Sequence, residues 1–186
     1  AVPSKTNDLD IFLVVDESGS TYIKASGVSG PTNLAMAKRS AVSILKTLVC
    51  DHLPLLRRQK VLHDAQRVYV SVFMFHHGCR TIVERRDISD ASVDISDVCR
   101  AILADSSAGG TNFCAFARAM RKAVSRAPES LVVACILTDG GAYDLNTFLG
   151  EFEQMKSTVA DVRTVVVGFG AWVDEATARM IQTDGH

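Results

Sequence analysis

Apolar residues along the chain form continuous runs separated by segments with helical spacing. Four runs rich in β-branched residues predict strands: LDIFLVV (9–15), RVYVSVFMF (67–75), LVVACIL (131–137) and VRTVVVGF (162–169). Three runs are nearly continuous, as expected for strands covered on both faces, whereas 67–75 alternates in part. A fifth strand is expected at 80–85, joined to the second in a hairpin by the tight turn HHGC.

The segments between these runs predict helices. Apolar positions repeat with helical spacing at 32–49, 111–127 and 144–159, and shorter helices are expected at 94–104 and after Asp174. Residues 20–31 are expected to form a loop, and 50–66 an irregular charged helix and connector. Alternating strands and helices predict a doubly wound, Rossmann-like α/β fold. Its sheet is mostly parallel, with one antiparallel edge strand and helices on both faces.

Polar residues cluster where the predicted strands end. In DESGS, the side chains of Asp16, Ser18 and Ser20 share one side of an extended segment because they are two residues apart. The segments GGTN and TDGG add Thr111 and Asp139. Ligands of such sheets bind beyond the carboxyl ends of the strands, so we expect these five side chains to converge.

Three hydroxyls and two carboxylates suit a hard divalent cation. Mg²⁺ is the first expectation, with Mn²⁺ and Ca²⁺ as alternatives, because these ions prefer oxygen ligands. A cation held largely by neutral hydroxyls keeps an affinity for a carboxylate from outside. Each motif alone is more typical of a polar turn or a helix cap, and only their combination favours a metal site.

The motifs resemble those of von Willebrand factor type A (vWA) domains. The metal-ion-dependent adhesion site (MIDAS) of that family has the pattern Asp-x-Ser-x-Ser, then a Thr, then an Asp. The resemblance extends to about residue 182. It implies that Ser18, Ser20 and Thr111 contact the metal, that Asp16 and Asp139 act directly or through water, and that an acidic side chain of a partner protein takes the sixth position.

Further residues are expected to surround this site. Those expected at a partner-binding rim are Tyr22, Asn112, Tyr143, Asp144 and Trp172. Ordinary packing or surface roles remain open for Tyr143, Asp144 and Trp172. His76, His77 and Cys79 could contribute to a soft-metal site, but an exposed hairpin tip is the favoured interpretation.

Composition limits the partners and the compartment. The 186 residues carry a net charge of −1, which gives no support for a nucleic-acid partner. The longest apolar run, 131–137, is too short for membrane insertion. Five cysteines without a CxxC spacing favour a reducing, cytoplasmic location over an extracellular or cell-surface one. A first residue that is Ala rather than Met suggests a piece of a larger protein.

The function expected from these features is metal-dependent protein binding in intracellular complex assembly, for example with a ring-forming ATPase or a ubiquitin-pathway scaffold. A cell-surface or secreted adhesion module is the alternative. A Mg²⁺-dependent phosphohydrolase is a less favoured alternative, because nucleotide-binding and nucleophile-elbow motifs are missing. Such an enzyme would also need a basic side chain to hold the phosphate, and Lys24 is the one nearby cation that the order of elements indicates. We therefore expect a binding module and not an enzyme.

The resemblance also bears on the end of the chain. Family members usually add one more strand and a closing helix after the helix that starts near Asp174. Residues 1–186 are thus expected to form a single vWA domain that lacks these last two elements. The strand 162–169 would then lie at the sheet edge, and either further residues of the chain or another chain would complete that edge.

Overall fold

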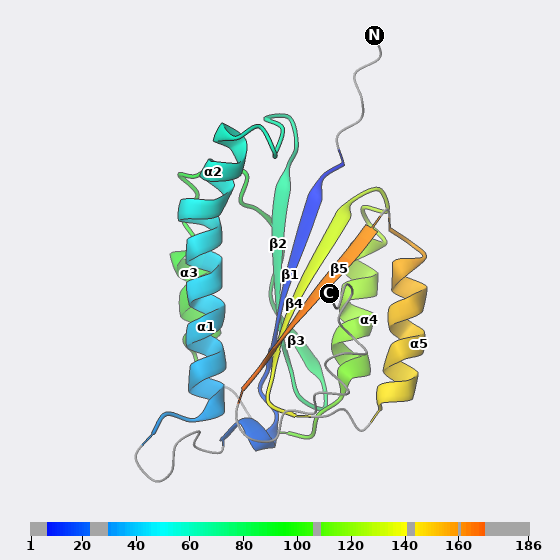
Figure 1. The fold of residues 1–186 in the computed structure, drawn as a ribbon. Coiled ribbons are helices and arrows are strands. Elements are labelled where there is room, and N and C mark those ends of the chain that lie inside the picture. Colours follow the sequence, from blue (N-terminus) through cyan, green and yellow to red (C-terminus); the bar gives the residue numbers. More distant parts are fainter. Residues whose placement is uncertain (1–6, 23–29, 106–108, 141–143, 160, 170–186) are drawn as a thin grey trace.

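A mostly parallel sheet forms the centre of the molecule (Figure 1). The computed structural model describes residues 7–22, 30–105, 109–140, 144–159 and 161–169. Its strands are β1 (Leu9–Asp16), β2 (Val68–Phe75), β3 (Cys79–Asp87), β4 (Leu131–Thr138) and β5 (Asp161–Gly168), in the order β3-β2-β1-β4-β5. Only the β2–β3 pair is antiparallel among the described strands. The predicted sheet, with its antiparallel edge, is confirmed.

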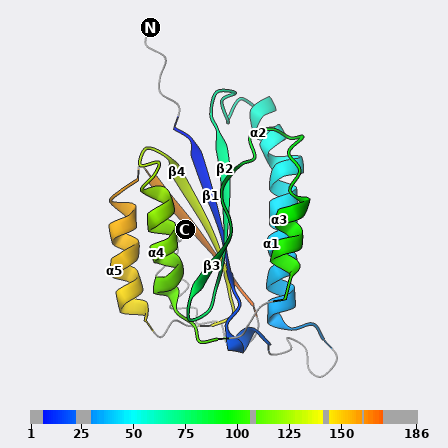
Figure 2. The ribbon, with the colours of Figure 1, turned by 180° about the vertical axis from the view of Figure 1, so that it is seen from behind.

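Helices cover both faces of this sheet (Figures 1 and 2). The α-helices are α1 (Asn33–Thr47), α2 (Leu53–Arg58), α3 (Ser96–Leu103), α4 (Phe113–Val124) and α5 (Leu145–Lys156). α1 to α3 lie on one face, and α4 and α5 lie on the other. A π-helical turn, η3 (Leu48–His52), joins α1 to α2, so the segment expected to be irregular continues the preceding helix. The helix expected after Asp174 lies outside the described residues.

Two apolar layers hold the helices to the sheet. On the side of α1 and α3, Leu13 and Val15 of β1 join the even-numbered side chains of β2. On the other side, Phe12 and Val14 meet a group of phenylalanines; these are Phe73, Phe75, Phe113, Phe116, Phe148 and Phe152. Successive side chains of β1 therefore supply opposite cores, as a strand covered on both faces requires. In the described part of the chain, no helix is long and apolar enough to cross a membrane.

Two expectations about strand burial were wrong. β2 is buried along almost its whole length. Even the polar Ser71 is only 1% exposed, and its hydroxyl accepts a hydrogen bond from the Arg85 backbone N–H. β5, in contrast, alternates: Val162 is buried, whereas Val165 is 47% exposed. Within the described residues β5 pairs with β4 alone.

Candidate metal centre

The DESGS segment turns back on itself directly after β1. The Ser18 backbone N–H donates to Asp16 Oδ1 at 2.8 Å, and the Thr21 hydroxyl donates to the Ser18 carbonyl at 2.6 Å. A one-turn 3₁₀-helix, η1 (Gly19–Tyr22), follows at the start of the segment that was expected to be a loop. The turn places the Ser18 and Ser20 hydroxyl oxygens 3.1 Å apart.

The end of β4 lies against this turn. The Thr138 hydroxyl donates to Asp16 Oδ2 at 2.7 Å, and the Ser20 hydroxyl donates to Asp139 Oδ1 at 2.8 Å. β1 and β4 are adjacent and parallel, so their carboxyl ends meet at one edge of the sheet. The structure therefore brings Asp16, Ser18, Ser20 and Asp139 into one hydrogen-bonded group, in which Ser20 and Asp139 are 119 residues apart in the sequence.

The segment that carries Thr111 reaches the same turn through its backbone. The Gly19 N–H donates to the Gly109 carbonyl at 2.6 Å. A Cβ atom on Gly109 would lie 2.4 Å from His77 Nδ1 and 2.8 Å from His76 Nδ1, so a side chain here would force the two histidine rings to shift. Thr111 follows two residues later and is half-buried, and among the described residues no hydrogen bond joins it to the other four.

The two carboxylates are buried without a positive partner. Asp16 is fully buried and Asp139 is 2% exposed. Burial raises the pKa of Asp16, and the negative charge of Asp139 acts in the same direction, against hydrogen bonds from Ser18 and Thr138. Among the described residues, no Lys, Arg or His forms an ion pair with either acid. A bound cation would supply the missing charge, so the oxygen-rich donor set fits a hard divalent ion.

Asn33 is a site residue that the sequence analysis missed. It is the first residue of α1 and is 2% exposed, and its Nδ2 donates to Asp139 Oδ2 at 3.2 Å. Its Oδ1 is buried without a hydrogen-bond partner. Thr32 provides the helix cap by accepting from the Ala35 N–H, so the Asn33 side chain is not needed for capping. The sequence signal that could have identified Asn33 is a polar residue directly after a residue that already caps the helix.

Comparison with solved structures decides the fold. A manganese-loaded TRAP protein of Plasmodium vivax aligns with a TM-score of 0.60 at 18% identity over 94% of this chain. A von Willebrand factor type A protein of Catenulispora acidiphila aligns with a TM-score of 0.56 at 14% identity over 95%. The chain has the von Willebrand factor type A fold.

A third structure with this vWA fold carries zinc in its own MIDAS motif. Proximal thread matrix protein 1 of the mussel byssus, with a zinc-occupied MIDAS motif, aligns with a TM-score of 0.61 at 17% identity over 96% of this chain. The chain spans 62%, 36% and 40% of the lengths of the three proteins, in the order given. No protein-family model matches the sequence, and no curated protein sequence matches it.

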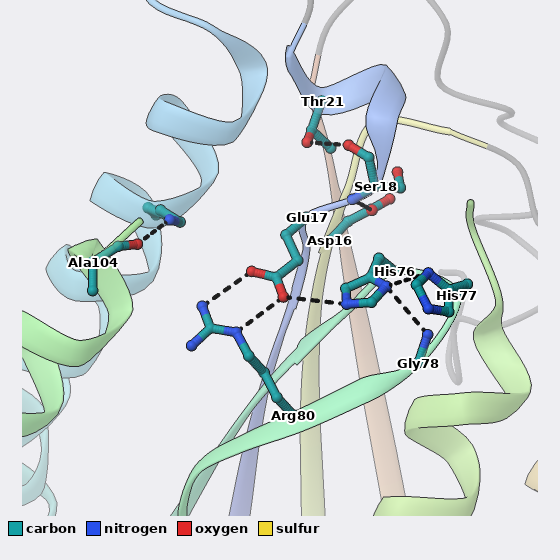
Figure 3. A network of polar contacts seen from close by, with 10 residues as sticks. Asp16, Glu17, Ser18, Thr21, His76, His77, Gly78, Arg80 and Ala104 are labelled. Atoms are coloured by element: carbon teal, nitrogen blue, oxygen red, sulfur yellow. Dashed lines mark hydrogen bonds and ion pairs between the residues drawn. The ribbon is translucent and has the colours of Figure 1, made fainter. Parts of the chain in front are cut away.

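A second buried acid follows Asp16 directly and does have a charged partner (Figure 3). Glu17 is fully buried, and its carboxylate accepts from Arg80 Nε at 3.0 Å and Nη2 at 3.1 Å. His76 Nε2 lies 4.0 Å from the same carboxylate. Because Arg80 belongs to β3, this ion pair fastens the β2–β3 hairpin to the turn that carries the candidate ligands.

The basic residue expected near the site, Lys24, lies outside the described residues. Two others were missed: Arg80, and Lys38 of α1, which is 6% exposed and donates to the Ala104 carbonyl. Burial lowers the pKa of Lys38, and the charge of Glu17 acts against that effect. Both cations are therefore engaged with other groups of this vWA fold, away from Asp16 and Asp139.

The hairpin tip offers a poor soft-metal site. The Nδ1 atoms of His76 and His77 lie 2.8 Å apart, within hydrogen-bond distance of each other. Burial, with the charge of Glu17, raises the pKa of the Cys79 thiol to about 12, so the thiolate form that metals require is disfavoured. No group of three His, Cys, Asp or Glu side chains suited to a metal occurs in the described part of the chain.

The expected rim residues lie in different settings. Tyr22 is 41% exposed, in η1 next to Thr21. The Asn112 side chain caps α4 by accepting from the Ala115 N–H at 3.2 Å. Tyr143 and Trp172 lie outside the described residues.

Asp144 also interacts with the start of α4. Its two carboxylate oxygens accept from the backbone N–H groups of Phe113 at 3.0 Å and Cys114 at 2.8 Å. Burial acts to raise the pKa of Asp144, but these bonds, and one from the Cys114 side chain, outweigh it and hold the pKa below its usual value. The contact ties the start of α5 to that of α4.

Proposed function

We propose that the chain is a metal-dependent protein-binding module. Ser18, Ser20 and Thr111 would hold a divalent cation, together with Asp16 and Asp139 directly or through water. One observation carries the proposal: Asp16 and Asp139 are buried beside the hydroxyls of Ser18 and Ser20. Among the described residues, no cationic side chain pairs with either acid. The manganese and zinc in two structural neighbours support a divalent ion in this fold.

The residues of the site divide the work of binding. Ser18 and Ser20 offer neutral oxygens, and Thr138 and the Ser18 N–H hold the Asp16 carboxylate in place. Such an ion, when bound, offers an open position to a carboxylate of a partner protein. Mg²⁺ is the proposed occupant because the ligands are hard oxygens and Mg²⁺ keeps some of its waters.

A double substitution of the two serines tests the site. Ser18→Ala with Ser20→Ala should abolish Mn²⁺ binding in calorimetry, because it removes two proposed ligands from a turn and not from a core. Ser43→Ala, at an exposed position of α1, is the matched control and should bind as the wild type does. Unchanged Mn²⁺ affinity in the double variant, with an intact circular dichroism spectrum, would show that the ion is held elsewhere.

The open position can be tested with a simple carboxylate. Bound Mn²⁺ should shorten the proton relaxation times of acetate when acetate enters the coordination sphere of the protein-bound ion. The effect should disappear in the double serine variant and persist in the Ser43→Ala control. Relaxation of acetate that matches that of a neutral probe, such as acetamide, would argue against a position that selects carboxylates.

We also propose that the chain is not an enzyme. Lys38 donates to a backbone carbonyl and Arg80 pairs with Glu17, so neither is available to hold a phosphate beside Asp16. Ser18 has the Ser20 hydroxyl as its side-chain partner, and the described residues provide no histidine in contact with it to act as a base. Metal-dependent hydrolysis of nucleotides or phosphoesters that is lost in Asp16→Ala would overturn this part of the proposal.

For the biological setting we propose assembly of intracellular complexes. All five cysteines are unpaired in the structure, which supports a reducing compartment. An adhesive extracellular setting is the second candidate, because one structural neighbour is a matrix protein of the mussel byssus. A thiol count on protein purified without reductant and then denatured separates the two: five thiols support the first, and fewer thiols that return to five after reduction support the second.

A further inference from the structure

Asn33 has one satisfied and one unsatisfied end, both buried at the candidate metal centre. Its Nδ2 donates to Asp139 Oδ2 at 3.2 Å, whereas its Oδ1 has no partner. The amide orientation is fixed, since a flipped amide would direct its oxygen at a carboxylate that can only accept. A buried carbonyl oxygen without a donor destabilises the fold, so a native protein keeps one only for a reason.

Nothing in the local fold uses this oxygen. Thr32 caps α1 through its side chain and accepts from the Met36 N–H through its backbone. Asp139 already receives the Ser20 hydroxyl on its other oxygen at 2.8 Å. The unsatisfied Oδ1 therefore belongs to the same amide whose Nδ2 donates to a proposed ligand, and it is closed to bulk water because Asn33 is only 2% exposed.

From this juxtaposition we infer that Asn33 is part of the metal centre. Its Nδ2 orients Asp139, and its Oδ1 accepts a hydrogen bond from a water molecule bound to the divalent cation. Mg²⁺ and Mn²⁺ retain water in such sites, and outer residues that orient ligands commonly change metal affinity about 10- to 100-fold when they are replaced. The inference rests on the proposed function, since it assigns a role towards the same ion.

Two substitutions of Asn33 should act in opposite directions on Mn²⁺ affinity measured by calorimetry. Asn33→Leu keeps the size of the side chain but removes both polar ends, and should weaken binding about tenfold or more. Asn33→Asp removes the donor to Asp139 but adds a negative charge close to the ion; the charge should dominate and strengthen binding about tenfold. A residue that only supports the fold would weaken binding in both variants.

Asn146 supplies matched controls. It is an exposed residue in the first turn of α5, as Asn33 is in the first turn of α1. Asn146→Leu and Asn146→Asp therefore repeat both chemical changes near a helix N-terminus, including the favourable effect of a negative charge there. Both should bind Mn²⁺ with the wild-type affinity. Melting in EDTA, followed by circular dichroism, checks that every variant is folded.

The outcomes separate this inference from the metal site itself. Weaker binding by Asn33→Leu and tighter binding by Asn33→Asp, in folded proteins, support the role of Asn33. If the wild-type domain binds Mn²⁺ but the two Asn33 variants show any other pattern, the role of Asn33 is overturned and the metal site stays in place. Failure of the wild-type domain to bind Mn²⁺ overturns the site and the role of Asn33 together.

Discussion

Asp10 and Asp16 lie on the same face of β1, one near each end. Both are buried, but they differ in whether a charged side chain pairs with them. Asp10 is 2% exposed and accepts from Arg85 Nε at 2.8 Å and Nη2 at 3.1 Å. Asp16 is fully buried, and it accepts hydrogen bonds from the Ser18 backbone N–H and the Thr138 hydroxyl. One strand therefore carries one buried acid with a charged partner and one without.

The difference separates a structural acid from a candidate ligand. A buried carboxylate is stable when a guanidinium neutralises it with two parallel hydrogen bonds, as Arg85 does for Asp10. The guanidinium also lies 4.1 Å from the centre of the Tyr69 ring, and the hydrogen bond with Asp10, helped by the Asp10 charge, raises the pKa of Arg85 against the effect of burial. Asp16 has only neutral donors and a second acid, Asp139, beside it, so its charge is left for an ion to balance.

Glu17 strengthens this contrast because it neighbours Asp16 yet belongs with Asp10. Arg80 binds it through two nitrogens, in the same manner as Arg85 binds Asp10. Two of the three buried acids of this strand and its following turn thus have an arginine from β3. Arginines of β3 thus pair with Asp10 and Glu17, whereas no described arginine pairs with Asp16. This difference is what would be expected if an ion balances the charge of Asp16.

The largest effect is expected when the structural acid loses its arginine. Arg85→Met leaves the Asp10 charge buried and unpaired, and should lower the free energy of unfolding by about 3–5 kcal/mol in urea denaturation. Combining Arg85→Met with Asp10→Leu should recover most of the loss, since both charges are then gone. A loss below about 1 kcal/mol in the single variant would mean that Asp10 is not held by this ion pair.

A smaller loss is expected for Glu17→Gln. Arg80 is 38% exposed, so solvent weakens the pair, and we expect a loss of about 1–2 kcal/mol. Mn²⁺ affinity should change less than about threefold, because Glu17 faces Arg80 and not the candidate ligands. If Mn²⁺ binding is lost as completely as in the double serine variant, Glu17 belongs among the ligands and does not differ in role from Asp16.

Asp16→Asn should have the opposite sign in metal-free protein. Burial raises the pKa of Asp16, so its contribution to stability is present below the unfolded pKa of about 3.9 and is lost as the pH rises through the folded pKa. At pH 7 the charged group opposes folding. The substitution should therefore raise the free energy of unfolding in EDTA by about 1 kcal/mol.

Mn²⁺ provides the second half of this measurement. Added Mn²⁺ should raise the melting temperature of the wild type by mass action and leave that of Asp16→Asn unchanged. Asp51→Asn, at an exposed position of η3, controls for the change in net charge. A metal-free Asp16→Asn protein that is less stable than the wild type would show that Asp16, like Asp10, is mainly structural.

The parts of this picture that the sequence could predict follow from local pattern and topology. Continuous apolar runs identified the strands, and the rule that parallel strands end at one edge brought DESGS and Asp139 together. The arginine pairs could not be predicted in this way. Arg85 reaches Asp10 across 75 residues, from a strand whose register shifts near Val72, and with a backbone φ of 49° at Arg85 itself. Such a bulge has no clear signal in the sequence, and neither has the depth at which Asn33 is buried.

An effect as small as that of Asp16→Asn is expected at Asp144, an acid held by a helix end and not by an arginine or an ion. Its pKa is lowered because hydrogen bonds from the Cys114 side chain and from two backbone N–H groups at the start of α4 outweigh the effect of burial. A lowered pKa gives stability that is present above the unfolded pKa of about 3.9 and is lost as the pH falls through the folded pKa. Asp144→Ala should therefore cost about 1 kcal/mol at pH 7, and less below about pH 4. Urea denaturation at several pH values measures this, with Asp51→Ala as the control; a cost that stays constant from pH 7 to about pH 3 would mean that the charge of Asp144 does not stabilise α4.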